Sequence, residues 1–217
     1  MSIQQNLIKI KSSLPSHVTL VAVSKTKPVV DLIEAYDAGQ RIFGENKIQE
    51  MTEKRDVMPK DIEWHMIGHV QSNKVKYMAE YVSLIHGVDS LKLLEEINKQ
   101  SKKHNRVINC LLQMYIAEEE TKFGLDEKEL IEILDSTTFK NLNNINVIGL
   151  MGMATFTDNQ EQIKKEFQNL KTIFDKFKIH YTKFTTLSMG MSGDYQLAIE
   201  CGSTMVRIGS SIFGGRS

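Results

Sequence analysis

The stretch VTLVAVSKTKPVVDLIEAYDAG, residues 18–39, contains a complete strand-and-helix unit. Its first part, residues 18–24, is an apolar run rich in β-branched side chains, which favours a buried strand. Its last part, residues 29–39, has apolar residues at helical spacing and a closing glycine, which predicts a helix. Between the two lie Lys25 and Lys27, followed at once by a proline. A lysine at the end of a buried strand is either part of an ordinary solvated strand end or a residue placed for covalent chemistry.

The same alternation continues along the chain. Further strands are predicted over residues 41–46, 62–68, 82–89, 107–116, 146–155, 184–190 and 205–213. Helices are predicted between them, one over residues 70–81, and a first helix over residues 3–13 precedes the first strand. About eight such units predict a single closed (β/α)8 TIM barrel of the α/β class, spanning residues 1–217 as one domain. A doubly wound open sheet is the alternative, less favoured because no glycine-rich dinucleotide fingerprint follows the first strand.

Composition excludes several classes of protein. The chain has 217 residues, 27 Lys and Arg against 27 Asp and Glu, and a formal net charge of +0, which gives no support to nucleic-acid or anionic-membrane binding. Cys110 and Cys201 show no metal-ligand spacing and are expected to be reduced thiols of a cytoplasmic protein. The N-terminal residues contain no long apolar stretch, so neither a secretory signal nor a membrane span is expected.

In a barrel of this kind, functional residues lie at the C-terminal ends of the strands. The seventh strand leads into SMGMSGD, residues 188–194, and the eighth carries RIGSS, residues 207–211. Loops after these two strands often hold phosphate, because glycines allow close backbone N–H approach and serines add donors. Each loop alone is as well explained by ordinary turns and helix caps. Their occurrence in the last two units together favours a phosphate site.

Two cations complete a recognisable set of groups. Lys25 could act as a counterion or, with a lowered pKa, form a Schiff base with a carbonyl, and Lys27 is expected to be a nearby charge. Arg207 lies in an apolar strand and is either half of a structural ion pair or a donor to a ligand ring nitrogen. A carbonyl-trapping lysine, an anion site and an arginine together suggest pyridoxal phosphate (PLP). An arginine would leave the pyridine nitrogen unprotonated and the ring a weak electron sink.

Six segments of the sequence match a known family. These are AVSKTKP (22–28), FGEN (43–46), WHMIGHVQSNK (64–74), GLMGMAT (149–155), LSMGMSGD (187–194) and GSTMVRIGSSIFG (202–214). In order and along nearly the whole chain, they closely resemble the YggS/PROSC-type pyridoxal phosphate homeostasis proteins. The resemblance implies a barrel like the N-terminal domain of bacterial alanine racemase.

The resemblance also implies specific contacts. It places PLP on Lys25 as an aldimine, with Arg207 facing the pyridine nitrogen. It implies that the phosphate is held by Ser188, Gly209 and Ser210, and that the ring lies beside Asn46 and Met189. It further implies a secondary PLP contact at Lys122. The chain departs from the family pattern at Met66, Val70 and Ser210, where Phe, Leu and Thr are usual, and these changes are expected only to repack or to keep a hydroxyl.

Two classes of function remain open. The first is a PLP carrier or buffer without robust catalysis, whose recipients would be PLP-dependent apo-enzymes and which would be a monomer. The second is a racemase-like enzyme, which needs acid–base groups on both faces of the substrate adduct. In the racemase fold one of these groups is a tyrosine from a second domain, and this chain is expected to lack that domain and to have no catalytic residues. A Schiff-base aldolase is a third possibility that explains Arg207 poorly. No metal site is expected, and His65 is expected to be a satisfied core residue.

Overall fold

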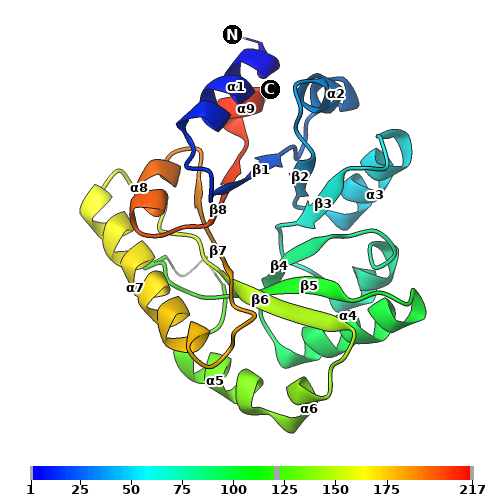
Figure 1. Ribbon diagram of the computed structural model, residues 1–217, viewed down its shortest axis with the longest axis vertical. Coiled ribbons are helices and arrows are strands. Elements are labelled where there is room, and N and C mark those ends of the chain that lie inside the picture. Colours follow the sequence, from blue (N-terminus) through cyan, green and yellow to red (C-terminus); the bar gives the residue numbers. More distant parts are fainter. Residues whose placement is uncertain (1, 120–122, 216–217) are drawn as a thin grey trace.

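The computed structural model describes residues 2–119 and 123–215. Eight parallel strands close into a barrel in chain order, β1 to β8, with β8 pairing back to β1. The strands are β1 Thr19–Val23, β2 Ile42–Glu45, β3 Glu63–Met66, β4 Leu84–Val88, β5 Ile108–Gln113, β6 Ile145–Met151, β7 Thr186–Met191 and β8 Met205–Ile208. The helices cover the outside of the strand ring (Figure 1). The predicted fold, a single ring of eight βα units, is confirmed.

The helical segments follow the strands and have recognisable ends. They are α1 Ile3–Ser13, α2 Val29–Asp37, α3 Ile48–Val57, the 3-10 helix η1 Ser72–Tyr77, α4 Leu91–Lys103, α5 Glu127–Asp135, α6 Thr137–Lys140, α7 Gln160–Lys178, α8 Tyr195–Glu200 and α9 Ser210–Phe213. Capping boxes start α1 at Ser2 and α5 at Asp126, where each cap side chain accepts an N–H of the first turn. Helix α1 packs against α9 on the outside of the barrel (Figure 1).

One predicted element was wrong in type, and another was too long. The helix predicted over residues 70–81 is only the short 3-10 helix η1. Val75 and Met78, which are both fully buried, lie three residues apart, a spacing that a three-residue turn places on one face. The strand predicted over residues 205–213 ends at Ile208, and its last part forms α9 instead.

Apolar side chains fill two separate layers. The larger layer lies between the strands and the helices and includes Phe43, Trp64 and Phe167. The smaller cluster contains Val21, Leu84, Leu111, Met151 and Met205. Residues two apart on a strand share a face, so the side chains of Val21 and Met205 lie on the same faces of β1 and β8 as those of Lys25 and Arg207. The smaller cluster therefore fills the barrel interior beneath the strand ends that carry the predicted site.

Candidate functional site

A cavity of about 770 Å³ opens among the loops that follow the strands. This volume is within the range of roughly 300–1,000 Å³ that is typical of small-molecule sites. Five of the seven predicted site residues line it: Lys25, Asn46, Arg207, Gly209 and Ser210. They come from three different units of the barrel, those of β1, β2 and β8. The sequence-based grouping of these positions at one mouth is therefore reproduced, although their contacts with a ligand stay a prediction.

Lys25 reaches the cavity because strand alternation continues past the end of β1. Val21 lies in the interior cluster, and Val23 and Lys25, two and four residues later, both line the cavity. The next residue, Thr26, has a φ of 63°, the left-handed conformation that a β-branched residue rarely adopts. Its backbone N–H donates to Glu50 Oε1 at 2.6 Å, and this bond holds the turn. Lys25 itself is half-buried.

Beneath this turn lies a group of one hydroxyl and three charged side chains, Ser24, Glu45, Glu50 and Lys54, which we call the carboxylate brace. Lys54 Nζ donates to Glu45 Oε1 at 2.8 Å, to Glu50 Oε1 at 2.7 Å and to the Ser24 carbonyl at 2.8 Å. Ser24 Oγ donates to Glu45 Oε1 at 2.6 Å. The brace thus connects α3 to the ends of β1 and β2, and it fixes the backbone on either side of Lys25.

Burial and hydrogen bonding have opposite effects on the pKa of Glu45. Its side chain is fully buried, and desolvation raises the pKa of the carboxyl group, while the bonds from Lys54 and Ser24 lower it. Within the described part of the chain, Glu45 Oε2 is the one buried side-chain oxygen or nitrogen without a hydrogen-bond partner. The brace therefore holds the carboxylate through a single oxygen.

Arg207 has a different environment. It is 4% exposed, and its guanidinium donates to Ser188 Oγ at 2.6 Å and to the Gly152 carbonyl at 3.0 Å. Burial lowers the pKa of Arg207 to about 10, and the charge of Asp194 acts in the opposite direction. Arg207 is therefore charged at neutral pH, and both of its hydrogen-bond acceptors are neutral. The predicted alternative of a structural ion pair is not seen: no ion pair of Arg207 occurs in residues 2–119 and 123–215.

Ser188 and Met189 are not among the cavity-lining residues. Ser188 is fully buried and contacts Arg207, and Met189 packs in the layer between strands and helices. Strand β7 pairs Ser188 with Met205 and Met191 with Arg207, so it contains an extra residue opposite β8. Gly190, at φ 98°, lies in this bulge, which brings Met191 rather than Gly190 to the face of Ser188, and Met191 lines the cavity. The predicted ligand contacts of Ser188 and Met189 stay predictions.

The loops after β7 and β8 contact each other at the cavity. Gly209 N–H donates to Ser192 Oγ at 3.1 Å, and both residues line the cavity together with Gly193 and Ser210. A Cβ at Gly209 would lie 3.0 Å from the Val23 carbonyl oxygen, closer than most such contacts. The glycine therefore permits β1 and the last loop to approach each other. Both serine- and glycine-rich stretches meet here, as predicted from their strand positions.

The prediction of site residues missed the wall formed by the loops after β3 and β5. His69 and Gln113 line the cavity there. His69 Nδ1 lies 3.6 Å from Asp89 Oδ2, and its ring meets Phe123 edge-on at 5.0 Å between centroids. Gln113 Nε2 donates to the Phe123 carbonyl at 2.8 Å. His69 directly follows the strand predicted over residues 62–68, which is the signal that could have identified it. Gln113 lies inside the strand predicted over residues 107–116, and only the observed end of β5 places it at the cavity.

Two lysines discussed with the site have different outcomes. Lys27 lines the same cavity, and its ammonium donates to the Gly215 carbonyl at 2.7 Å. Its proximity to Lys25 agrees with the expectation of a neighbouring charge. Lys122, the predicted secondary contact, lies outside the described residues.

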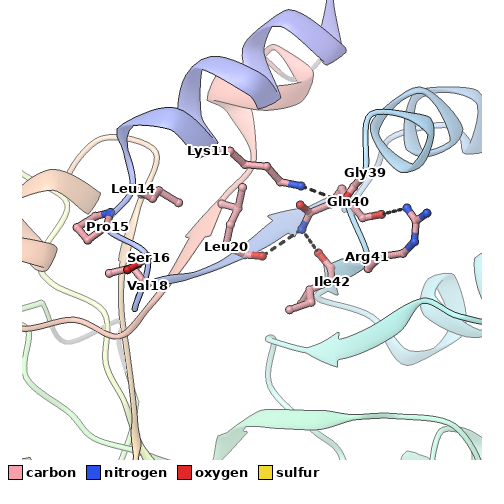
Figure 2. Close-up of a pocket in the computed structure, with 10 residues that line it drawn as sticks. All are labelled: Lys11, Leu14, Pro15, Ser16, Val18, Leu20, Gly39, Gln40, Arg41 and Ile42. Carbon is pink, nitrogen blue, oxygen red and sulfur yellow. Dashed lines mark hydrogen bonds between the residues drawn. The ribbon is translucent and has the colours of Figure 1, made fainter.

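A second hollow, of about 340 Å³, lies where β1 and β2 begin, at the opposite end of these strands from Lys25. Figure 2 shows that its polar side chains point to the backbone. Lys11 Nζ donates to the Gly39 carbonyl at 2.9 Å, and Gln40 Nε2 donates to the carbonyls of Leu20 and Ile42 at 3.0 and 2.7 Å. These contacts tie α1 and the end of α2 to the strands, which is a structural use.

No group of three or more His, Cys, Asp or Glu side chains in residues 2–119 and 123–215 could hold a metal ion. In the same part of the chain, no helix has the length and hydropathy needed to cross a membrane.

Comparisons with known proteins agree with this geometry. The family model "alanine racemase, N-terminal domain" matches residues 1–217. The pyridoxal phosphate homeostasis protein of Vibrio alginolyticus is 40% identical over 230 residues, covering 99% of this chain and 98% of that protein. The solved structure of PipY from Synechococcus elongatus with PLP bound is 33% identical, covers 98% of this chain and 100% of that one, and has a TM-score of 0.89. Alanine racemase of Clostridium difficile, 17% identical with a TM-score of 0.82, shares the fold.

Proposed function

We propose, on the premise that this chain belongs to the alanine racemase N-terminal domain family, that it binds pyridoxal phosphate and acts in PLP homeostasis. The premise is supported by relatives that are 37–40% identical over nearly the whole chain and are named pyridoxal phosphate homeostasis proteins. The solved structure of PipY, one-third identical, contains PLP. The homeostasis names and the bound PLP belong to these relatives. The cavity of this chain supplies the physical argument that it binds PLP as well.

The observation that carries the proposal is the convergence of three kinds of group in one cavity. Lys25 offers a primary amine, Arg207 a buried guanidinium, and the loop at Gly209 and Ser210 a close backbone with a hydroxyl. PLP has an aldehyde, a ring nitrogen and a phosphate, which require an amine, a partner for the nitrogen and an anion site. The donor set therefore fits the cofactor. When bound, PLP supplies an aldehyde that condenses with an amine and releases water.

We assign the residues as follows. Lys25 is the covalent attachment residue, and the Glu50 bond to the Thr26 N–H holds its turn. Arg207 would donate to the ring nitrogen, and Asn46, which also lines the cavity, would lie beside the ring. The two joined loops would hold the phosphate, with Ser192 and Gly209 beside Ser210.

Ser188 and Met189 support the site from behind. Ser188 holds Arg207 through the 2.6 Å bond, and Met189 packs the β7 backbone against the helices. The direct ligand contacts that the family resemblance implies for these two residues stay predictions beside this assignment.

We propose that the chain carries or buffers PLP, with PLP-dependent apo-enzymes as recipients, and that it has no robust catalytic activity. The homeostasis names of the relatives support a carrier. Arg207 supports it too, because a guanidinium cannot give a proton to the ring nitrogen, and an unprotonated ring stabilises carbanions poorly. We also propose that the protein is a monomer in solution, a state that light scattering would measure.

The attachment residue is tested by loading the purified protein with PLP, reducing it with borohydride and mapping the modified peptide by mass spectrometry. The adduct is expected on Lys25. Lys25→Ala should lose it, while Lys27→Ala, a matched change at the neighbouring cavity lysine, should keep it. An adduct on another lysine, or an unaltered adduct yield in Lys25→Ala, would remove Lys25 from this position.

The carrier assignment has its own test. The PLP-loaded protein is incubated with single amino-acid enantiomers and analysed by chiral chromatography, with alanine racemase as the positive control. Carrier function predicts no robust turnover. Racemisation at rates typical of enzymes would establish the racemase-like alternative instead.

A further inference from the structure

We propose that His86 and His65, through Ser188, position Arg207 by a directed chain of neutral hydrogen bonds. This chain gives the guanidinium a neutral acceptor and leaves it a charged donor for a ring nitrogen that carries no proton. We call these four residues the arginine chain. The inference rests on the proposed PLP binding, and it assigns functions to two histidines that do not line the cavity.

The arginine chain crosses the barrel interior from β3 to β8. His65 Nδ1 lies 3.1 Å from His86 Nε2, and His86 Nδ1 lies 3.0 Å from Ser188 Oγ. Ser188 Oγ accepts from Arg207 Nη1 at 2.6 Å. The side chains are 0–4% exposed, so water does not compete for these bonds. Only the last member, Arg207, lines the cavity.

The positions of the protons follow from what each group can donate. A guanidinium only donates, so Ser188 Oγ is the acceptor in its bond with Arg207. Ser188 has one proton left to donate, and among the described residues its other side-chain partner is His86 Nδ1. His86 then carries its proton on Nε2 and donates it to His65 Nδ1. The opposite tautomer of His86 would leave the Ser188 proton without an acceptor. Every bond thus points away from Arg207.

Both histidines are neutral in this arrangement. Burial lowers the pKa of His65 to about 3. Burial, with added repulsion from the charges of His65 and Arg207, lowers the pKa of His86 well below its usual range. His65, His86 and Ser188 therefore add no charge to the barrel interior. The guanidinium donates hydrogen bonds to neutral groups, and the charge of Asp194 also acts on it.

These neutral acceptors determine what Arg207 can recognise. A carboxylate in place of Ser188 would cancel the positive charge and turn the guanidinium toward itself. Neutral acceptors leave the charge available on the cavity side, where a ring nitrogen with a lone pair is attracted and a protonated one is repelled. The histidines thus act through Arg207, as positioning residues that favour one protonation form of the ring.

The first test uses the cofactor-free protein. Nitrogen-15 NMR of the imidazole rings at neutral pH is expected to show His65 and His86 as neutral rings protonated on Nε2. An Nδ1–H tautomer or an imidazolium signal for His86 would overturn the proposal. Because this measurement needs no PLP, it decides on the arginine chain even if the unaltered protein fails to bind PLP, a result that would overturn the proposed function instead.

The second test compares two substitutions at one position. His86→Leu removes the acceptor for Ser188, while His86→Asn keeps an acceptor close to the position of Nδ1. PLP affinity is expected to fall about tenfold in His86→Leu, the effect of one lost buried hydrogen bond, and to stay within about threefold in His86→Asn. Nitrogen-15 NMR of ring-labelled PLP should show an unprotonated ring nitrogen in the unaltered protein and a shifted signal in His86→Leu.

Two outcomes of this comparison contradict the proposal. Equal loss of affinity in both variants would show that the histidine only fills space. Unchanged affinity and an unchanged ring-nitrogen signal in His86→Leu would show that Arg207 is positioned without it. Circular dichroism of each variant checks that the barrel is intact, and the tautomer measurement on the unaltered protein remains decisive where a variant does not fold.

Discussion

Two buried polar clusters, the carboxylate brace and the arginine chain, treat charge in opposite ways. In the brace, the Lys54 ammonium lies within 2.8 Å of the carboxylates of Glu45 and Glu50. In the arginine chain, the Arg207 guanidinium contacts a hydroxyl and a carbonyl. The first cation is compensated inside the protein and fixes the turn that carries Lys25. The second keeps its charge for the cavity. Buried cations in one barrel can therefore have a structural or a ligand-binding use, and the partner atoms distinguish the two.

The largest expected effect breaks the brace. Lys54→Met leaves Glu45 buried without its cation, and removing one partner of a buried ion pair costs about 3–5 kcal/mol. We expect a loss of this size in the free energy of unfolding, measured by urea denaturation. The double variant Lys54→Met with Glu45→Gln should recover part of it, because no buried charge is then left alone. A loss below about 1 kcal/mol for the single variant would contradict the compensated role of Lys54.

Removing the Arg207 cation is expected to reduce stability less than Lys54→Met does, and to reduce PLP affinity more. Arg207→Met leaves Ser188 Oγ and the Gly152 carbonyl without the donor that they have now, but it also removes a desolvated charge. We therefore expect the free energy of unfolding to fall by at most about 2 kcal/mol. PLP affinity should fall more than tenfold. Urea denaturation of Lys54→Met and Arg207→Met measures the loss of stability, and PLP titration of the same two variants measures the loss of affinity. A larger stability loss for Arg207→Met than for Lys54→Met would reverse the comparison.

The two clusters are also expected to respond to pH in opposite directions. The pKa of His65 falls from 6.5 to about 3 on folding, so between these values the unfolded chain binds the extra proton and stability falls as pH falls. The pKa of Glu45 is raised above 4.5 on folding, so its contribution is present below 4.5 and is lost as pH rises through the folded value.

Urea denaturation between pH 6 and pH 4 separates these contributions. His65→Gln should reduce the pH slope of the unfolding free energy by about 1.4 kcal/mol per pH unit, the value for one proton. Glu45→Gln should change the slope in the opposite direction. An unaltered slope in His65→Gln would mean that this histidine is not held neutral.

The smallest expected effect concerns the edge of the brace. Glu50→Gln keeps the side-chain shape but weakens the bonds to the Thr26 N–H and to Lys54, and Glu50 is partly exposed. We expect about 1 kcal/mol of destabilisation by urea denaturation. Glu53→Gln, an exposed position on the same helix, is the matched control and should change stability by less than about 0.5 kcal/mol. Equal effects of the two variants would show that the brace does not extend to Glu50.

The sequence predicted the barrel because the alternation of apolar strands and amphipathic helices is a property of each unit separately. It also grouped Lys25 with Arg207, since simple alternation along β1 and β8 turns both toward the cavity. The segment at Val75 was assigned to the wrong helix type because three- and four-residue spacing give similar apolar patterns. His65 was correctly expected to be a satisfied core residue. Its partner is on another strand, so the arginine chain could not be predicted from local patterns.

Strand β7 shows where assigning side chains to the two faces of a strand by simple alternation fails. A period of two assigns Ser188 and Gly190 to one face and Met189 and Met191 to the other. The register shift between Ser188 and Met191 changes this assignment, and only pairing with β8 reveals it. Gly190 itself is a weak signal, because a glycine in a strand is compatible with several backbone conformations.

This bulge makes strand length a determinant of the site. A Cβ at Gly190 would lie 2.6 Å from Ala198 Cβ, so the bulged backbone is also closely packed under α8. Without the extra residue, Ser188 and Met191 would lie two residues apart and would share the cavity face by ordinary alternation. The bulge therefore keeps both side chains on that face although three steps of β7 lie opposite two steps of β8. The number of residues between Ser188 and Met191, together with their pairing to β8, thus determines which side chain of β7 lies at the cavity.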